Sequence, residues 1–131
     1  MAIDNLWGNL PEGDKIETPL SILKEQANYL TVATKGLLEG KILVLTKQPE
    51  NIQVSFRLVA PPLGGYEIEL FAIGYGIGMY PVNMALKGPA GVGIIISNTQ
   101  EQFLANLGKV LQSPGVRDAV SKLMTQIKSS Q

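Results

Sequence analysis

Two stretches of this chain decide its fold: Ile52-Gln53-Val54-Ser55-Phe56-Arg57-Leu58 and Tyr66-Glu67-Ile68-Glu69-Leu70. Apolar and polar residues alternate in both, and a period of two puts successive side chains on opposite faces of a strand. The intervening Pro61-Pro62-Leu63-Gly64-Gly65 suits a turn, because proline cannot donate to a strand ladder and glycine accepts positive φ. The sequence therefore predicts a β-hairpin over residues 52–73.

The hairpin has a predicted register and two predicted faces. If Ala60 pairs with Tyr66, then Arg57 lies opposite Glu69 and Ser55 lies opposite Phe71. The inner, core-forming face is predicted to consist of Ile52, Val54, Phe56, Leu58, Tyr66, Ile68 and Leu70. The same alternation continued along the second strand predicts that Glu67, Glu69, Phe71 and Ile73 share the outer face. The apolar end of that face needs a cover, which is the chain's own helices, a ligand or another subunit.

Periodicity and end signals place the other elements around this hairpin. A helix is predicted over 18–36, with Thr18 as N-cap and Pro19 in the first helical position. Strands are predicted over 41–47, 80–86 and 92–96. Two helices follow, one with the capping-box spacing of Asn98 and Glu101 and one that begins at Ser113-Pro114. Short links between successive strands favour an antiparallel meander. The predicted fold class is α+β: a four- to five-stranded, mostly antiparallel meander sheet packed with an N-terminal helix and two C-terminal helices.

The domain organisation is predicted to be simple. A chain of 131 residues matches one ordinary domain, which we place at residues 18–131. Residues 1–17 are predicted to form an irregular arm. Its apolar residues Leu6, Trp7 and Leu10 either pack on the domain, which we favour, or lie on a second subunit.

Composition excludes several classes of function. The chain has no cysteine and no histidine, which excludes disulfides, thiol catalysis, Ser-His-Asp chemistry and the usual zinc sites. Eleven basic and eleven acidic residues give zero net charge, and the cations are scattered, so nucleic acid and anionic membranes are not expected partners. No signal peptide or long apolar run is visible, and a cytoplasmic location is predicted. We predict no cofactor and no metal.

Two further patterns in the sequence resemble functional sites. Glycines recur at 74, 76 and 78 and again at 88, 91 and 93, but neither group has the spacing of a phosphate-binding loop. Glu67 and Glu69 lie about 6–7 Å apart along a strand. Glycosidase carboxylates fall in this range, yet such pairs on strands are usually solvated.

The predicted function is that of a non-enzymatic protein-interaction domain, acting as a homo-oligomer. The alternative is a small-molecule-binding domain, or an enzyme independent of histidine and cysteine, with a pocket near the 55–80 sheet face. The candidate binding residues are Arg57, Glu67, Glu69, Phe71, Ile73, Tyr75 and Tyr80. A closed pocket that gathers Arg57 or the glutamates with Tyr75 or Tyr80 would favour the alternative. A flat outer face buried against a second copy would favour the first reading.

Overall fold

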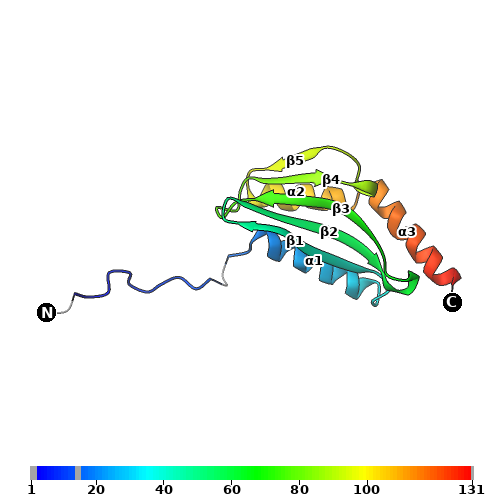
Figure 1. Ribbon diagram of the computed structural model, residues 1–131, viewed down its shortest axis with the longest axis horizontal. Helices are drawn as coiled ribbons and strands as arrows, with labels where there is room; N and C mark the ends of the chain where they lie inside the picture. Colours follow the sequence, from blue (N-terminus) through cyan, green and yellow to red (C-terminus); the bar gives the residue numbers. More distant parts are fainter. Residues whose placement is uncertain (1–2, 14–15, 131) are drawn as a thin grey trace.

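A five-stranded antiparallel sheet forms the centre of the fold (Figure 1). Its strands lie side by side in the order of the sequence: β1 (Glu39–Gln48), β2 (Asn51–Ala60), β3 (Tyr66–Tyr75), β4 (Val82–Leu86) and β5 (Ile94–Ser97). The computed structural model describes residues 3–13 and 16–130. The predicted α+β fold with an antiparallel meander is confirmed.

The helices leave one face of this sheet open. α1 (Pro19–Ala33) packs against β1 and α2 (Gln100–Leu111) against β5, both behind the sheet in the view of Figure 1. α3 (Pro114–Ser129) contacts the short 3₁₀ turns η1 (Pro61–Leu63) and η2 (Gly88–Ala90) at one end. We call the helix-covered face the inner face and the opposite one the outer face. Among the described residues, no helix covers the outer face.

The helix ends follow the predicted chemistry with two shifts. Thr18 is the N-cap of α1 and Pro19 its first residue, as predicted, and Thr18 also forms a capping box with Ser21. The helix stops at Ala33, earlier than predicted, and Gly36 then takes a left-handed φ of 80°. The N-cap of α2 is Thr99 instead of Asn98, because the Thr99 hydroxyl accepts from the Gln102 backbone N–H at 3.1 Å.

A β-bulge at Leu70 changes the predicted faces of β3. Ala60 pairs with Tyr66 and Arg57 with Glu69, as predicted, but Phe56 then pairs with Phe71, leaving Leu70 as an extra residue. Ser55 therefore lies opposite Ala72, and the predicted pairing with Phe71 is wrong. One extra residue reverses the side on which every later side chain of the strand points.

The bulge turns Phe71, Ile73 and Tyr75 toward the helices. Phe71 and Ile73 are 0% and 1% exposed, so the prediction that they lie on the outer face is wrong. The Phe71 ring stacks on Phe56 with centroids 5.1 Å apart and planes 11° apart. The inner face is otherwise as predicted, except that Tyr66 is half exposed.

The N-terminal arm does not pack on the domain. Leu6, Trp7 and Leu10 are 88%, 78% and 63% exposed, and the arm runs away from the sheet (Figure 1). The prediction that they dock on the core is wrong, because the arm forms no helix or strand between residues 3 and 13 that would gather them on one face. Residues 1–2 and 14–15 of the predicted arm, and residue 131 of the predicted domain, lie outside the described residues. No helix among the described residues is long and apolar enough to cross a membrane.

Candidate functional site

The outer face of the sheet carries a groove whose floor is made of small residues. Cross-strand pairing puts Ala72 of β3 beside Ala85 of β4, and Gly74 of β3 beside Asn83 of β4. Their neighbours Ile73 and Met84 point to the inner face and are buried, so Ala72, Gly74 and Ala85 face outward. The two central strands thus present little side-chain bulk at this point.

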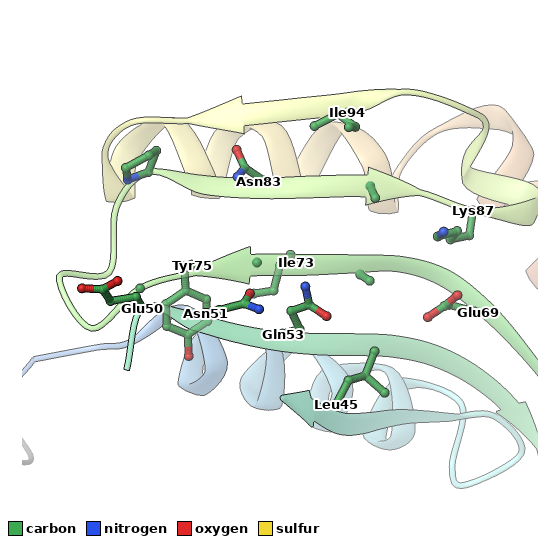
Figure 2. Close-up of a pocket in the computed structure, with 15 residues that line it drawn as sticks. Leu45, Glu50, Asn51, Gln53, Glu69, Ile73, Tyr75, Asn83, Lys87 and Ile94 are labelled. Carbon is green, nitrogen blue, oxygen red and sulfur yellow. The ribbon is translucent and has the colours of Figure 1, made fainter. Parts of the chain in front are cut away.

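Larger side chains surround this floor and make it concave. Figure 2 shows Leu45 of β1 on one side and Ile94 of β5 on the other, with Gln53 and Asn83 between them. Glu69 and Lys87 lie at one end of the groove, and Glu50 and Asn51 lie at the other. The groove has a volume of about 680 Å³, within the range of about 300–1,000 Å³ that is common for ligand sites.

A cluster of four charged side chains adjoins the Glu69 end of the groove. The Arg57 guanidinium contacts the Glu67 carboxylate at 3.2 Å, and the Lys41 ammonium contacts its other oxygen at 3.3 Å. Ser55, which is 0% exposed, donates to the Glu69 carboxylate and accepts from Arg57 Nε at 3.2 Å. Arg57 thus lies opposite Glu69 in register but forms its ion pair with the diagonal neighbour Glu67.

The chemistry of this cluster is that of a balanced surface network. Lys41 and Arg57 both pair with Glu67, Ser55 links Arg57 to Glu69, and the side chains of Lys41, Arg57 and Glu67 are 47%, 30% and 26% exposed. Ion pairs with this exposure contribute about 0–1 kcal/mol each. The network fixes Glu67 and Glu69 in different environments, one paired to cations and the other bonded to a hydroxyl.

Tyr75 and Tyr80 lie on the helix side of the molecule. The Tyr75 side chain is 8% exposed, and burial raises the pKa of its phenol. Burial, with a smaller contribution from the Glu17 carboxylate, also raises the pKa of Tyr80. The Tyr80 and Phe103 rings pack edge to face with their centroids 6.5 Å apart. The raised pKa extends the neutral form of both phenols to a higher pH than usual.

The structure divides the seven predicted residues into three groups. Arg57, Glu67 and Glu69 come together on the outer face. Phe71, Ile73 and Tyr75 have buried side chains, although Ile73 and Tyr75 still border the groove. Tyr80 is partly buried against the core, beside Phe103. The groove therefore gathers Glu69 with Tyr75, but it includes neither Arg57 nor Tyr80.

Sequence reasoning missed the residues that shape the groove. These are Leu45, Gln53, Ala72, Gly74, Asn83, Ala85, Lys87 and Ile94. The one available signal was the pair of adjacent apolar residues Leu70-Phe71, which interrupts the alternation and marks the bulge. Among the described residues, no group of three or more acidic side chains is placed to hold a metal ion.

Comparisons of this chain with protein-family models, with curated proteins and with solved structures found no match. Function is therefore inferred from the site, because a fold class alone does not imply one.

Proposed function

We propose that this chain is a protein-interaction domain that binds an extended segment of another protein in the outer-face groove and works as a homo-oligomer. The observation that carries the proposal is the small floor of Ala72, Gly74 and Ala85, on a sheet face that no helix of the described residues covers. A floor of this kind lets a peptide backbone approach closely, which bulky side chains would prevent.

The polar residues of the groove suit peptide groups. Asn51, Gln53 and Asn83 carry carboxamides, each with both a donor and an acceptor, as a peptide bond has. Leu45 and Ile94 offer apolar contacts on the two sides. Glu69 and Lys87 give the groove a charged end, which would fix the direction of a bound segment.

A small polar ligand is the second candidate, and the groove volume favours it. Against it stands the open shape of the site (Figure 2), since small-molecule pockets bury most of their ligand. The proposal assigns no reaction to the chain. We place the protein in the cytoplasm, with the absence of cysteine as support.

The groove is tested by filling it. Ala85→Arg puts a long cationic side chain on the floor, and Ala33→Arg makes the same change at an exposed position of α1. Peptides selected from a displayed random library on the wild-type chain should bind the Ala33→Arg variant normally and lose at least tenfold in affinity for Ala85→Arg. Circular dichroism checks that both variants are folded.

Three results would contradict the proposal. One is a library that yields no binder, and another is a set of binders that tolerate Ala85→Arg. The third is selective binding of a simple sugar or nucleotide, in a panel titrated by calorimetry, that Ala85→Arg abolishes. That result would assign the groove to the second candidate.

A further inference from the structure

The strand β5 forms one edge of the sheet, and half of its backbone groups face away from β4. The Leu86 N–H donates to the Gly93 carbonyl at 2.9 Å, so these two residues form a hydrogen-bonded pair. Hydrogen-bonded and non-hydrogen-bonded pairs alternate along an antiparallel ladder. Ile95 therefore bonds to β4, while Ile94 and Ile96 direct their N–H and C=O groups to the open edge.

The side chains along this edge are apolar and exposed, and they would not prevent another strand from pairing with it. Val92, Ile94 and Ile96 are 93%, 70% and 58% exposed. Residues 92–100 include no charged residue and no proline. Proteins usually protect an exposed edge with charges, proline or a bulge, because a free edge is a template for strand pairing.

The opposite edge of the same sheet has these protections. β1 carries the charged residues Glu39, Lys41 and Lys47. A β-bulge at Leu45 also breaks its regular ladder. The sheet is therefore protected at β1 and unprotected at β5, so β5 is the edge that is open to a partner strand.

We propose that β5 pairs with β5 of a second copy of this chain, antiparallel and across a two-fold axis at Ile95. This pairing uses the free backbone groups of Ile94 and Ile96 in both copies and sets Ile94 opposite Ile96 of the partner subunit. The segment is uncharged, so two copies meet without like-charge repulsion. The inference rests on the self-association in the proposed function and names its surface.

A two-fold contact also explains why assembly would stop at two copies. Pairing of β5 with β1 of another copy would leave a free edge at each end and continue into a fibre. Pairing of β5 with itself uses up the unprotected edge and leaves only the protected β1 edges outside. Because each strand is four residues long, the interface is small and the dimer is expected to be weak and concentration-dependent.

A proline at the free edge tests the pairing. Ile96→Pro removes an N–H that points away from β4, so the β4–β5 ladder keeps its hydrogen bonds. Ile96→Val keeps the N–H and the branched side chain and is the matched control. In sedimentation equilibrium, wild type and Ile96→Val should shift from monomer to dimer mass as concentration rises, and Ile96→Pro should remain monomeric throughout.

A cross-link gives a second test that does not depend on proline being tolerated. Across the proposed axis, the two Ile95 residues form a non-hydrogen-bonded pair with Cα atoms about 4.5 Å apart, a separation that a disulfide spans. The chain has no native cysteine. Under mild oxidation, Ile95→Cys should give covalent dimers and Val44→Cys, on the protected β1 edge, should not.

Several outcomes would overturn the inference. These are a wild-type chain that stays monomeric at every concentration, an Ile96→Pro variant that folds and dimerises like wild type, and cross-linking at Val44→Cys but not at Ile95→Cys. Loss of the dimer on deletion of residues 1–13 would assign it to the arm instead. Peptide binding by monomeric Ile96→Pro would show that the groove proposal stands whether or not the edge proposal does.

Discussion

At the scale of single residues, two helical glycines show how one added carbon can have opposite effects. A Cβ on Gly108 of α2 would meet only the end of the Gln112 side chain, at 3.8 Å. A Cβ on Gly115 of α3 would run into the backbone carbonyl of Pro89 in η2. Gly115 is therefore required for the close approach of α3 to η2, whereas Gly108 is not required by packing.

We expect Gly108→Ala to raise the free energy of unfolding by about 0.5–1 kcal/mol, because alanine is the better helix former. Gly115→Ala should lower it by about 1–3 kcal/mol, because η2 and α3 must move apart. Urea denaturation followed by circular dichroism measures both. Equal effects of the two substitutions would show that α3 does not press on η2 as described.

The phenol of Tyr80 is a second residue with a testable energetic role. Its hydroxyl is buried and has no hydrogen-bond partner among the described residues. A buried hydroxyl without a partner is a net cost to the folded state. Tyr80→Phe should therefore leave the free energy of unfolding at pH 7 unchanged or raise it by up to about 1 kcal/mol.

The raised pKa values of Tyr75 and Tyr80 predict a loss of stability in alkali. The unfolded phenols titrate near their ordinary pKa of 10.0, while the folded ones hold their protons more tightly. Below pH 10 the two phenols are neutral in both states and their contribution to stability is fully present, and it is lost as the pH rises further. The Tyr75→Phe/Tyr80→Phe double variant should lose less stability above pH 10 than wild type does. Parallel losses in thermal melts across this range would contradict the assignment.

At the scale of elements, the hairpin shows how far sequence patterns carry. The short 61–65 turn sets the register, which is why the pairing of Arg57 with Glu69 was predictable. Beyond Glu69 the prediction assumed an unbroken alternation. The adjacent apolar residues Leu70 and Phe71 were a sign of the bulge. The alternation of apolar and polar residues alone, however, does not show which strand contains the extra residue.

Deletion of Leu70 tests the bulge. Without it, Glu69 and Phe71 would follow one another opposite Arg57 and Phe56 in a regular ladder, so Phe71, Ile73 and Tyr75 would stay on the inner face. The loss is then the burial of the Leu70 side chain, about 1.5–3 kcal/mol. This is less than the stability of about 5–15 kcal/mol of an ordinary domain, so we expect a folded variant that unfolds cooperatively at a lower denaturant concentration.

Deletion of Leu45 is the matched control, because it removes the extra residue of the other bulge. Only three residues of β1 follow Leu45, and none of them is buried. This variant should fold with a modest loss of stability. If the chain lacking Leu70 gave no dispersed amide spectrum by NMR while the chain lacking Leu45 did, the assignment of Leu70 as the extra residue of the bulge would be contradicted.

At the scale of the whole molecule, the helices lie on one face of the sheet and the groove lies on the other. The layered α+β arrangement followed from the order of elements, because successive strands with short links form a meander. The groove did not. Ala72 and Ala85 are thirteen positions apart in the sequence and adjoin only through the pairing of β3 with β4. Their small size indicates a groove only once the strand order, and the sheet face on which each side chain lies, are known.

The exposed arm predicts that the domain folds without it. Leu6, Trp7 and Leu10 bury little surface in the fold, so deletion of residues 1–13 should change the free energy of unfolding by less than about 0.5 kcal/mol. Denaturant titrations of the two chains measure this difference. A loss of several kcal/mol would mean that the arm packs on the domain in solution.

The position of Trp7 also determines what tryptophan fluorescence can measure in this protein. It is the only tryptophan, and it lies on the arm instead of in the core. Its emission should resemble that of tryptophan in water in both the folded and the unfolded chain, so fluorescence excited at tryptophan wavelengths would pass through the unfolding transition almost unchanged. Because Trp7 emission does not respond to unfolding of the domain, a blue shift on addition of a binding partner would arise from the arm alone.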